Sequence, residues 1–410
     1  MEFPDKLPIP KEVVEIARKL ADAGFETWCV GGAVRDNLLG HGNKDFDLAT
    51  AARPEQVQEL FKRTIPIGVE HGTVAVLDRN RQPHEVTTFR EDIATDGRHA
   101  VVEFGVALDR DLARRDFTIN AIAYHPLKHE WRDRYDGMAD LERGVVRAVG
   151  DPNQRFQEDY LRILRALRFA ARFGFDIESA TWEAAKAQAG GLQHLSAERV
   201  RDEWSRGLET ARHPSWLVEQ WSEVGGLARW LPEVALQGGA PAGGEAVARQ
   251  IAGVSRWAAI DRLEPRDPVL TTSYLSADPG ATLERLRCSN AEIERGRRIG
   301  AHRGPLPDPE SPVEVRRWMS ACGPAVDDLV AIARAEGKGA RLADAVRAIR
   351  ASGAPLSVGD LAIDGNRLME LGVPKGPKVG ETLRELLDRS LEDPNLNTEE
   401  RLVALVRAGQ

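Results

Sequence analysis

Two aspartates separated by one residue are the first feature of the sequence that could carry chemistry. Asp45 and Asp47 flank Phe46 in the segment KDFDLAT, whose pattern predicts a strand with both carboxylates on one face. Two such charges about 4 Å apart repel by roughly 4 kcal/mol at an effective dielectric of 20, so the pair favours a bound cation. Mg²⁺ prefers carboxylate oxygens together with substrate phosphates. Glu85, on the later strand HEVTTF, is a candidate third catalytic acid, although an isolated Asp-x-Asp pair is often only a solvated strand edge.

A pair of glycines precedes these acids. Gly31 and Gly32 follow a short strand pattern and open a helix that carries Arg35 and Asp36. Paired glycines let the backbone approach a ligand closely, and the free N–H groups at a helix start bind phosphate. All four residues are therefore candidates for nucleotide binding, but an ordinary tight turn would look the same.

The segment RRDFTIN combines two cations, an acid and an amide around a short apolar core. Arg114 and Arg115 suit triphosphate oxygens, because the guanidinium group is always charged and binds in a bidentate manner. Asp116 and Asn120 could hold ribose hydroxyls, which would favour ribonucleotides. The alternative is a helix start with surface ion pairs.

The segment EDYLR lies in a strongly helical stretch and suggests a device for choosing a base. Asp159 and Arg162 stand three residues apart, so on a helix they share one face. An Asp accepts and an Arg donates hydrogen bonds, which matches the amino group and acceptor ring nitrogen that cytosine and adenine both present. Uracil and guanine would leave polar groups unpaired. Arg165 continues the same face and could reach phosphate, whereas a surface salt bridge is the alternative for the Asp–Arg pair.

The elements that must position these residues fall into two parts. In the first 145 or so residues we expect a small mixed sheet that is mostly complete by Phe89. Helices are predicted at 11–24, 34–40 and 53–63, and strands at 25–32, 45–50, 72–78 and 83–89.

After Asp151 the sequence becomes helical, with few strand signals. Helices are predicted at 156–172, 179–190, 196–210, 214–223, 281–299, 312–320, 324–336, 340–351, 378–391 and 398–408, with a loop at 237–244. A length of 410 residues predicts two to four domains.

Composition limits the class of protein. The content of 42% hydrophobic and 29% charged residues is typical of globular proteins, and no run of about 18 apolar residues predicts a membrane span. No secretory leader is expected, and the three dispersed cysteines form neither a metal motif nor a disulfide framework, which favours the cytoplasm. A net charge of −8 argues against indiscriminate nucleic-acid binding and predicts a weak, local grip on RNA.

Taken together, GGAVRD, DFDLAT, EVTTFR, RRDFTINAIAY and RFQEDYLRILRALRF resemble the class II tRNA nucleotidyltransferases and bacterial poly(A) polymerases of the polymerase-β-like superfamily. The resemblance covers residues 25 to about 210 and extends more loosely to 357–408. It implies an α+β, seahorse-like molecule. Its parts would be a mixed-sheet head (1–145), a helical neck that recognises the base (146–212), a helical body (213–350) and a helical tail that binds tRNA (351–410).

The resemblance also implies roles for single residues. Asp45 and Asp47 would bind the catalytic Mg²⁺, while Gly31, Gly32 and Arg35 would serve the triphosphate. Residues 90–104 match the family's flexible loop, which helps the switch from C to A and has full length here; its matching residues are Arg90, Asp96, Arg98 and His99. The segment SAERVRDE (196–203) would brace the templating helix, and Arg367, Lys375 and Lys378 could touch RNA backbone.

The predicted function is therefore the addition of C, C and A, from CTP and ATP, to the 3′ end of tRNA. An A-adding enzyme or a poly(A) polymerase shares all these motifs, and a non-catalytic RNA-binding module is a third alternative. No histidine is followed by Asp, so we expect no added phosphohydrolase activity, and no protein partner is evident.

Overall fold

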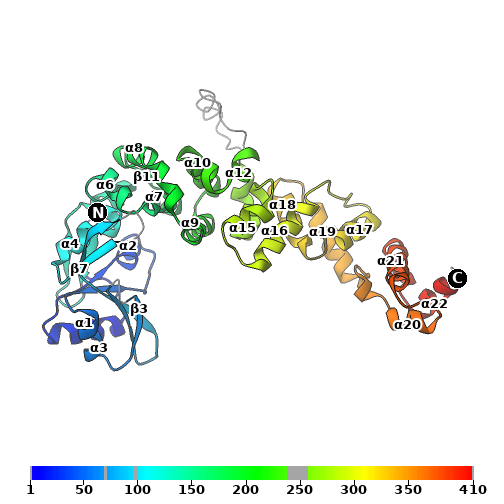
Figure 1. Ribbon diagram of the computed structural model, residues 1–410, viewed down its shortest axis with the longest axis horizontal. Coiled ribbons are helices and arrows are strands. Elements are labelled where there is room, and N and C mark those ends of the chain that lie inside the picture. The colour runs from blue at the N-terminus through cyan, green and yellow to red at the C-terminus, as the bar shows by residue number, and fades with distance from the viewer. Residues whose placement is uncertain (1, 69–71, 96–99, 238–256, 409–410) are drawn as a thin grey trace. The chain divides into compact units, whose positions relative to one another are not determined.

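The computed structural model describes residues 2–68, 72–95, 100–237 and 257–408. The chain divides into two compact units, Met1–Trp230 and Leu231–Gln410. The first, blue to green in Figure 1, holds the strands, and the second, green to red, is helical wherever it has regular structure. The division into four parts predicted from the sequence is finer than this and stays a prediction.

The first unit is built on a seven-stranded mixed sheet with the order β3-β4-β5-β2-β1-β8-β9. Its strands are β1 (Thr27–Val30), β2 (Asp47–Thr50), β3 (Thr64–Gly68), β4 (Thr73–Leu77), β5 (Pro83–Thr88), β8 (Ile122–His125) and β9 (Glu130–Asp133). Only β2 and β5 pair in parallel; the other neighbours are antiparallel. The sheet is mostly complete by Phe89, as expected, because five of its seven strands precede that residue. Strands β8 and β9 follow later, and β8 pairs with β1.

The helices of the sheet region are short. They are α1 (Lys11–Asp22), α2 (Gly32–Leu38), α3 (Pro54–Leu60), α4 (Leu108–Ala113) and α5 (Gly137–Arg143). The sequence did not predict α4, whose Leu108 and Leu112 stand one turn apart and pack against Trp28, Phe89 and Ala123. This packing fixes α4 against the sheet.

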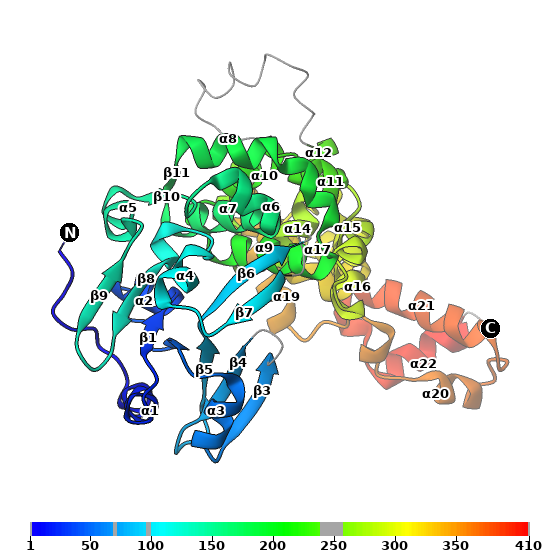
Figure 2. The same cartoon turned by 60° about the vertical axis from the view of Figure 1, so that its left-hand side comes forward.

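Two paired strands, here called the β6–β7 hairpin, occupy residues 90–95 and 100–104, where the sequence predicted a loop. Strands β6 (Arg90–Thr95) and β7 (Ala100–Phe104) pair antiparallel, with a register shift between Asp92 and Ala94. Figure 2 shows this hairpin with α4 beside it. Asp96, Arg98 and His99 lie outside the described residues.

The helical part of the first unit begins with a broken helix. The single helix predicted at 156–172 is wrong: α6 (Pro152–Glu158) ends before Asp159, whose φ of −156° and ψ of 104° are extended, and α7 (Leu161–Phe173) follows. The other helices are α8 (Ser179–Ala187), α9 (Ala197–Thr210), α10 (Pro214–Glu223) and α11 (Gly226–Trp230). A two-residue parallel ladder joins β10 (Val145–Val146) to β11 (Asp176–Ile177), and Trp204 of α9 packs edge-on against Trp221 of α10.

The second unit consists, where it is described, of helices around three apolar clusters. Its α-helices are α12 (Pro232–Gln237), α14 (Pro268–Leu275), α15 (Pro279–Arg285), α16 (Asn290–His302), α17 (Pro312–Cys322), α18 (Val326–Ala335), α19 (Ala340–Ala351), α20 (Gly365–Glu370), α21 (Pro377–Glu392) and α22 (Glu399–Ala408). The one helix predicted at 281–299 is two, because Ser289 starts α16 with a capping box. The loop predicted at 237–244 lies, from residue 238 onward, outside the described residues.

Contacts between helices of the second unit are polar as well as apolar. Arg316 of α17 is 7% exposed and donates to the main-chain oxygens of Leu391 (2.6 Å) and Glu392 (2.9 Å) at the end of α21. These carbonyls have no partner within their own helix, so the guanidinium group caps α21. Over the described ranges, no helix is long and apolar enough to cross a membrane.

Candidate functional site

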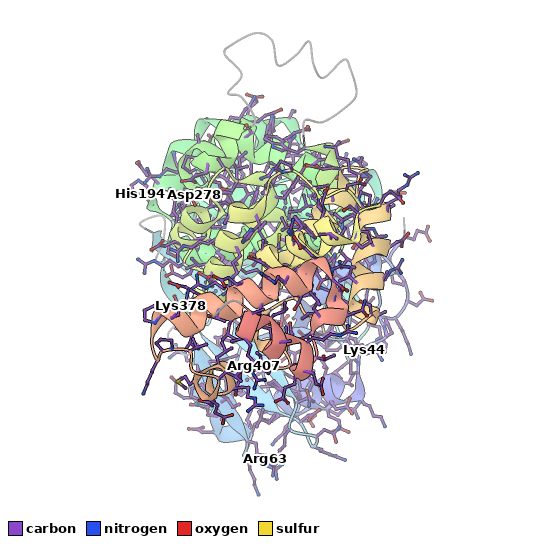
Figure 3. All side chains as sticks on the ribbon, turned by 90° about the vertical axis from the view of Figure 1, so that its right-hand side faces the viewer. Lys44, Arg63, His194, Asp278, Lys378 and Arg407 are labelled. Atoms are coloured by element: carbon purple, nitrogen blue, oxygen red, sulfur yellow. The ribbon has the colours of Figure 1, made fainter. Side chains whose placement is uncertain are left out.

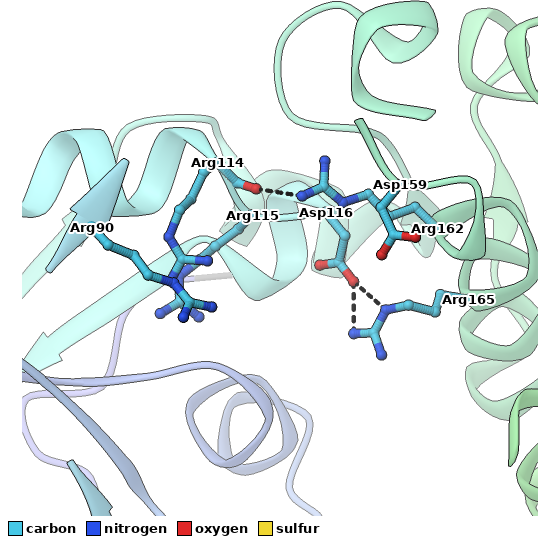
Figure 4. A pocket seen from close by; sticks show the side chains of 7 residues that line it. All are labelled: Arg90, Arg114, Arg115, Asp116, Asp159, Arg162 and Arg165. Atoms are coloured by element: carbon cyan, nitrogen blue, oxygen red, sulfur yellow. Dashed lines mark hydrogen bonds and ion pairs between the residues drawn. The ribbon is translucent and has the colours of Figure 1, made fainter. Parts of the chain in front are cut away.

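A cavity of about 350 Å³ in the first unit gathers residues that are far apart in the sequence. Its walls carry five arginines and two aspartates: Arg90, Arg114, Arg115, Asp116, Asp159, Arg162 and Arg165. All seven were predicted as site residues. In the view of Figure 4, the guanidinium groups of Arg90, Arg114 and Arg115 lie toward one end, and Asp159, Arg162 and Arg165 toward the other. The excess of positive charge suits an elongated anion.

The predicted acids lie on neighbouring strands of the sheet. Asp47 is the first residue of β2, and Glu85 lies on β5, which pairs with β2 from Leu48 onward. Asp45 precedes the strand and is exposed, so the expectation that both aspartates lie on a strand holds only for Asp47, while Phe46 is buried as expected. Within the described ranges, no three acidic, histidine or cysteine side chains gather as a metal site, and the catalytic role of Glu85 stays a prediction.

Electrostatics nevertheless single out Asp47. Burial, followed by the negative charges of Glu85 and Asp45, raises the pKa of Asp47 to about 6, against a partly offsetting effect of Arg115. A carboxylate in this position favours either a proton or a cation. Two aspartates are a set that Mg²⁺ accepts when substrate phosphates complete its coordination, so the donors fit that ion.

Gly31 connects the acids to the cavity. Its φ of 75° and ψ of −142° belong to a region that side chains rarely adopt. A Cβ atom placed there would stand 3.5 Å from Asp47 Oδ2 and 3.6 Å from Arg115 Nη1. The backbone of Gly31 therefore lies between an acid of the sheet and an arginine of the cavity wall, and a side chain would fill this space.

Asp116 organises the middle of the cavity. Its Oδ1 accepts from the Asn120 amide (2.9 Å) and its Oδ2 from Arg165 Nε (2.8 Å). Burial alone would raise the pKa of Asp116, but the Arg165 guanidinium and the Asn120 amide outweigh it and hold the pKa well below its usual value. Asp116 is therefore ionised at neutral pH.

Asp159 and Arg162 both line the cavity, but not in the way the sequence predicted. Because Asp159 lies in extended backbone between α6 and α7, the two residues do not share a helix face. The hydrogen bond between them joins main-chain atoms, since the Arg162 N–H donates to the Asp159 carbonyl oxygen at 3.0 Å. Instead, Asp159 Oδ2 accepts from Arg199 Nη2 of α9 (2.7 Å). Arg162 donates to Glu158 Oε2 (2.7 Å) and to the main-chain oxygen of Arg114 (3.0 Å). The brace predicted for 196–203 thus includes a direct contact with the proposed template.

Comparison with known proteins gives the family. Residues 27–147 match the poly(A) polymerase head domain, and residues 174–237 match a probable RNA- and SrmB-binding site of polymerase A. A CCA-adding enzyme of Leuconostoc mesenteroides is 44% identical over 239 residues, 53% of this chain and 59% of the relative. One of Streptococcus mutans is 47% identical over 208 residues, 50% of this chain and 51% of the relative.

A solved structure extends the likeness to nearly the whole chain. The Bacillus stearothermophilus CCA-adding enzyme in complex with CTP is 30% identical, with a TM-score of 0.79 over 97% of this chain and 96% of that one. The chain belongs to the family of CCA-adding enzymes. The family and the fold class predicted from the sequence are confirmed, although the sequence alignments span only about half to three-fifths of the length of the curated relatives.

Arg35 and Asp36, which the sequence of this CCA-adding family member predicted as nucleotide-binding residues, are not part of the cavity lining. Both are 3% exposed. The Arg35 guanidinium donates to Asp36 and Asn120 and lies 4.8 Å from the ring centres of Phe169 and Phe173. Their contacts place them at the joint between α2 and α7, and their predicted role in nucleotide binding stays a prediction. Gly32 lies beside this group as well, because a Cβ atom added to it would stand 3.6 Å from Arg35 Nη2.

The sequence did not single out Asp111 of α4. Its carboxylate is 1% exposed and accepts from both Arg114 and Arg115. The spacing of three and four residues between this acid and two arginines is a signal that could have found it. Glu158 and Arg199, which hold the proposed template residues, were likewise noticed only as neighbours of a motif.

Proposed function

We propose that this protein adds C, C and A to the 3′ end of tRNA, using CTP and ATP. The observation that carries the proposal is the cavity itself. Arg90, Arg114 and Arg115 lie at one end, where Arg115 is near the Asp47 carboxylate, and Asp159 and Arg162 stand toward the other. A nucleotide placed along it has its triphosphate at the arginines and its base at the Asp–Arg pair. The similar B. stearothermophilus enzyme was solved in complex with CTP, which supports CTP as a substrate of this protein.

The reaction is a displacement at phosphorus. The 3′-hydroxyl of tRNA attacks the α-phosphorus of the triphosphate; an O–P bond forms, the bond to the bridging oxygen breaks, and pyrophosphate leaves. Mg²⁺, held by Asp45 and Asp47, would supply charge stabilisation for the attacking and leaving oxygens. Arg114 and Arg115 bind the phosphates, and Gly31 leaves room for them beside Asp47.

Base choice is assigned to Asp159 and Arg162. The guanidinium of Arg162 donates and the carboxylate of Asp159 accepts, which satisfies the pairing edges of cytosine and adenine but not those of uracil or guanine. Glu158 and Arg199 hold the two side chains in place, because each makes a 2.7 Å charged contact with one of them. A site that leaves a wrong base unpaired discriminates strongly.

The decisive experiment offers the purified protein three tRNAs that end before CCA, after one C and after CC, with each nucleoside triphosphate separately. We expect C on the first two and A on the third, with no U or G. Addition to the CC-ended tRNA alone would instead identify an A-adding enzyme. Long A tails on unrelated RNA would identify a poly(A) polymerase, an alternative kept because residues 27–147 match the head domain of that name.

Two further assignments belong to this proposal. The parts 1–145, 146–212, 213–350 and 351–410 would act as catalytic head, base-reading neck, body and tRNA-binding tail. The cysteines Cys29, Cys288 and Cys322 are free, which supports the cytoplasm, where thiols stay reduced, as the place of action.

A further inference from the structure

Helix α4 holds a carboxylate where burial alone would not favour one. Leu108 and Leu112 of this helix pack into the apolar cluster under the sheet, and Asp111, beside Leu112, is 1% exposed. A buried, ionised carboxylate is unfavourable unless it is paired and hydrogen-bonded. The partners of Asp111 therefore explain its presence.

Those partners are three arginines of the cavity. Oδ1 of Asp111 accepts from Arg114 Nη2 (2.8 Å) and Nε (3.0 Å), and Oδ2 accepts from Arg115 Nη2 (3.1 Å). The main-chain N–H of Arg90 also points to Oδ1, at a longer 3.4 Å. Asp111 itself does not line the cavity, whereas all three partners do.

Charge and hydrogen-bonding capacity show that this cluster is incomplete without an anion. Burial would raise the pKa of Asp111, but the guanidinium groups of Arg115 and Arg114 outweigh it and lower the pKa, so the carboxylate is ionised at neutral pH. This one carboxylate is shared by two guanidinium groups, those of Arg114 and Arg115. In addition, Arg115 Nε is buried and has no hydrogen-bond partner among the residues that the structure describes.

We propose that Asp111 is a positioning residue that arranges Arg90, Arg114 and Arg115 as a receptor for the triphosphate of the incoming nucleotide. The inference rests on the proposed function and names a residue through which the phosphate site is built. Because Arg90 is the first residue of β6, the same carboxylate ties the base of the β6–β7 hairpin to the phosphate site. A bound polyphosphate therefore holds the hairpin through the Arg90 guanidinium.

The test measures binding of inorganic tripolyphosphate and of CTP to the full chain by calorimetry, in EDTA and without tRNA. Asp111→Asn should lower the affinity for both ligands to the same extent, about tenfold, which corresponds to about 1.4 kcal/mol. Asp111→Glu, which keeps the charge, should recover most of the affinity. Asp109→Asn is the matched control: Asp109 lies on the same helix but contacts Arg132 and Arg134, outside the cavity, and should leave both affinities unchanged.

A purely structural role would lower stability without this selectivity. In turnover, Asp111→Asn should raise KM for CTP and ATP about tenfold with KM for tRNA unchanged, as expected for lost binding of the phosphates. If Asp111→Asn does not fold, Arg90→Gln takes its place, because this variant keeps the main-chain N–H and removes only the guanidinium group. Arg90→Gln should also lower the affinity for tripolyphosphate. Unchanged tripolyphosphate affinity in the folded variants would overturn the proposal.

The two proposals fail separately. If the wild-type protein binds tripolyphosphate and loses it in Asp111→Asn, but adds no nucleotide to tRNA, the positioning role stands and the proposed function does not. If the wild-type protein adds CCA normally while Asp111→Asn binds tripolyphosphate like the wild type, the proposed function stands and the positioning role does not. Equal weakening by Asp109→Asn and Asp111→Asn would also overturn the positioning role.

Discussion

At the scale of single residues, the carboxylate of Asp47 stands where its charged form is unfavourable. Its pKa is raised from 3.8 to about 6, first by burial and then by Glu85 and Asp45. The folded protein therefore binds a proton more tightly than the unfolded chain. Stability from this group is present below about pH 4 and is lost as the pH rises to about 6.

Asp47→Asn should accordingly stabilise the protein while it removes activity. At pH 7.5 in EDTA, we expect the melting temperature of the first unit to rise by roughly 2–4 °C, as for about 1 kcal/mol in a unit of this size. At pH 4.5 the gain should nearly vanish, because the wild-type group is then protonated. Thermal melts at both pH values, with a nucleotide incorporation assay, check this; a gain independent of pH would contradict the electrostatic explanation.

Gly31 gives a second prediction at this scale. Gly31→Ala places a side chain at a φ of 75° and a ψ of −142°, a strained conformation that costs about 1–3 kcal/mol. The new Cβ also enters the space between Asp47 and Arg115. Gly40, with a φ of 79° and no heavy atom within 4 Å of an added Cβ, is the control. Both alanine variants should lose stability, but only Gly31→Ala should raise KM for CTP. The same KM for CTP in both variants would mean that Gly31 does not contribute to the nucleotide site.

At the scale of elements, the break between α6 and α7 positions Asp159, one of the two residues proposed to read the base. Extended backbone at Asp159 turns its carboxylate toward α9, where Arg199 holds it at 2.7 Å. Arg199→Ala should therefore loosen base choice, so that U or G is incorporated more often, while KM for CTP changes little. Arg206→Ala, an exposed position on the same helix, should leave fidelity intact. Misincorporation measured with each triphosphate tests this, and unaltered fidelity in Arg199→Ala would leave α9 a purely structural support.

The elements also show what sequence patterns can and cannot predict. Amphipathic spacing located α10 and α19 to the residue, because the buried residues of each recur at helical spacing. The same reasoning missed α14, whose residues are mostly buried and show no periodicity, and β8, whose four residues are all buried. It also extended one helix through Asp159, because the strong helical pattern on both sides hides a break made by tertiary contacts with α9.

The site was predictable in its members more than in its geometry. All seven cavity residues came from sequence motifs, yet Arg35, chosen with them, is buried between Phe169 and Phe173. Its burial depends on α7 packing against α2 across more than a hundred residues of sequence, which no local pattern reports. Asp111 was missed although its signal is local. Its spacing of three and four residues from Arg114 and Arg115 is visible in the sequence, but the same spacing is common in ordinary helical ion pairs.

At the scale of the whole molecule, a net charge of −8 limits how RNA can be held. Counterion release makes RNA affinity fall with salt in proportion to the number of phosphates contacted. Many cations in the described part of the second unit are already paired: Arg367 contacts Glu370 and Glu399, and Arg295 contacts Asp267 and Asp328. Lys375 is exposed, and Lys378, on the first turn of α21 and labelled in Figure 3, has only a long 3.4 Å contact with Glu381.

We therefore expect a shallow salt dependence of tRNA binding, with a slope of log affinity against log salt concentration of about −2 to −4. Lys375→Ala and Lys378→Ala should each make the slope less negative by up to about 1. Each should lower the affinity for all tRNAs alike, because a phosphate contact does not read sequence. Arg298→Ala, a partly exposed cation already paired with Glu294, is the control that should leave the slope unchanged. Titrations at several KCl concentrations measure these slopes. A steep wild-type slope, near −8, would mean that the acidic chain presents a broad basic surface to RNA, and the local grip inferred from its charge would be wrong.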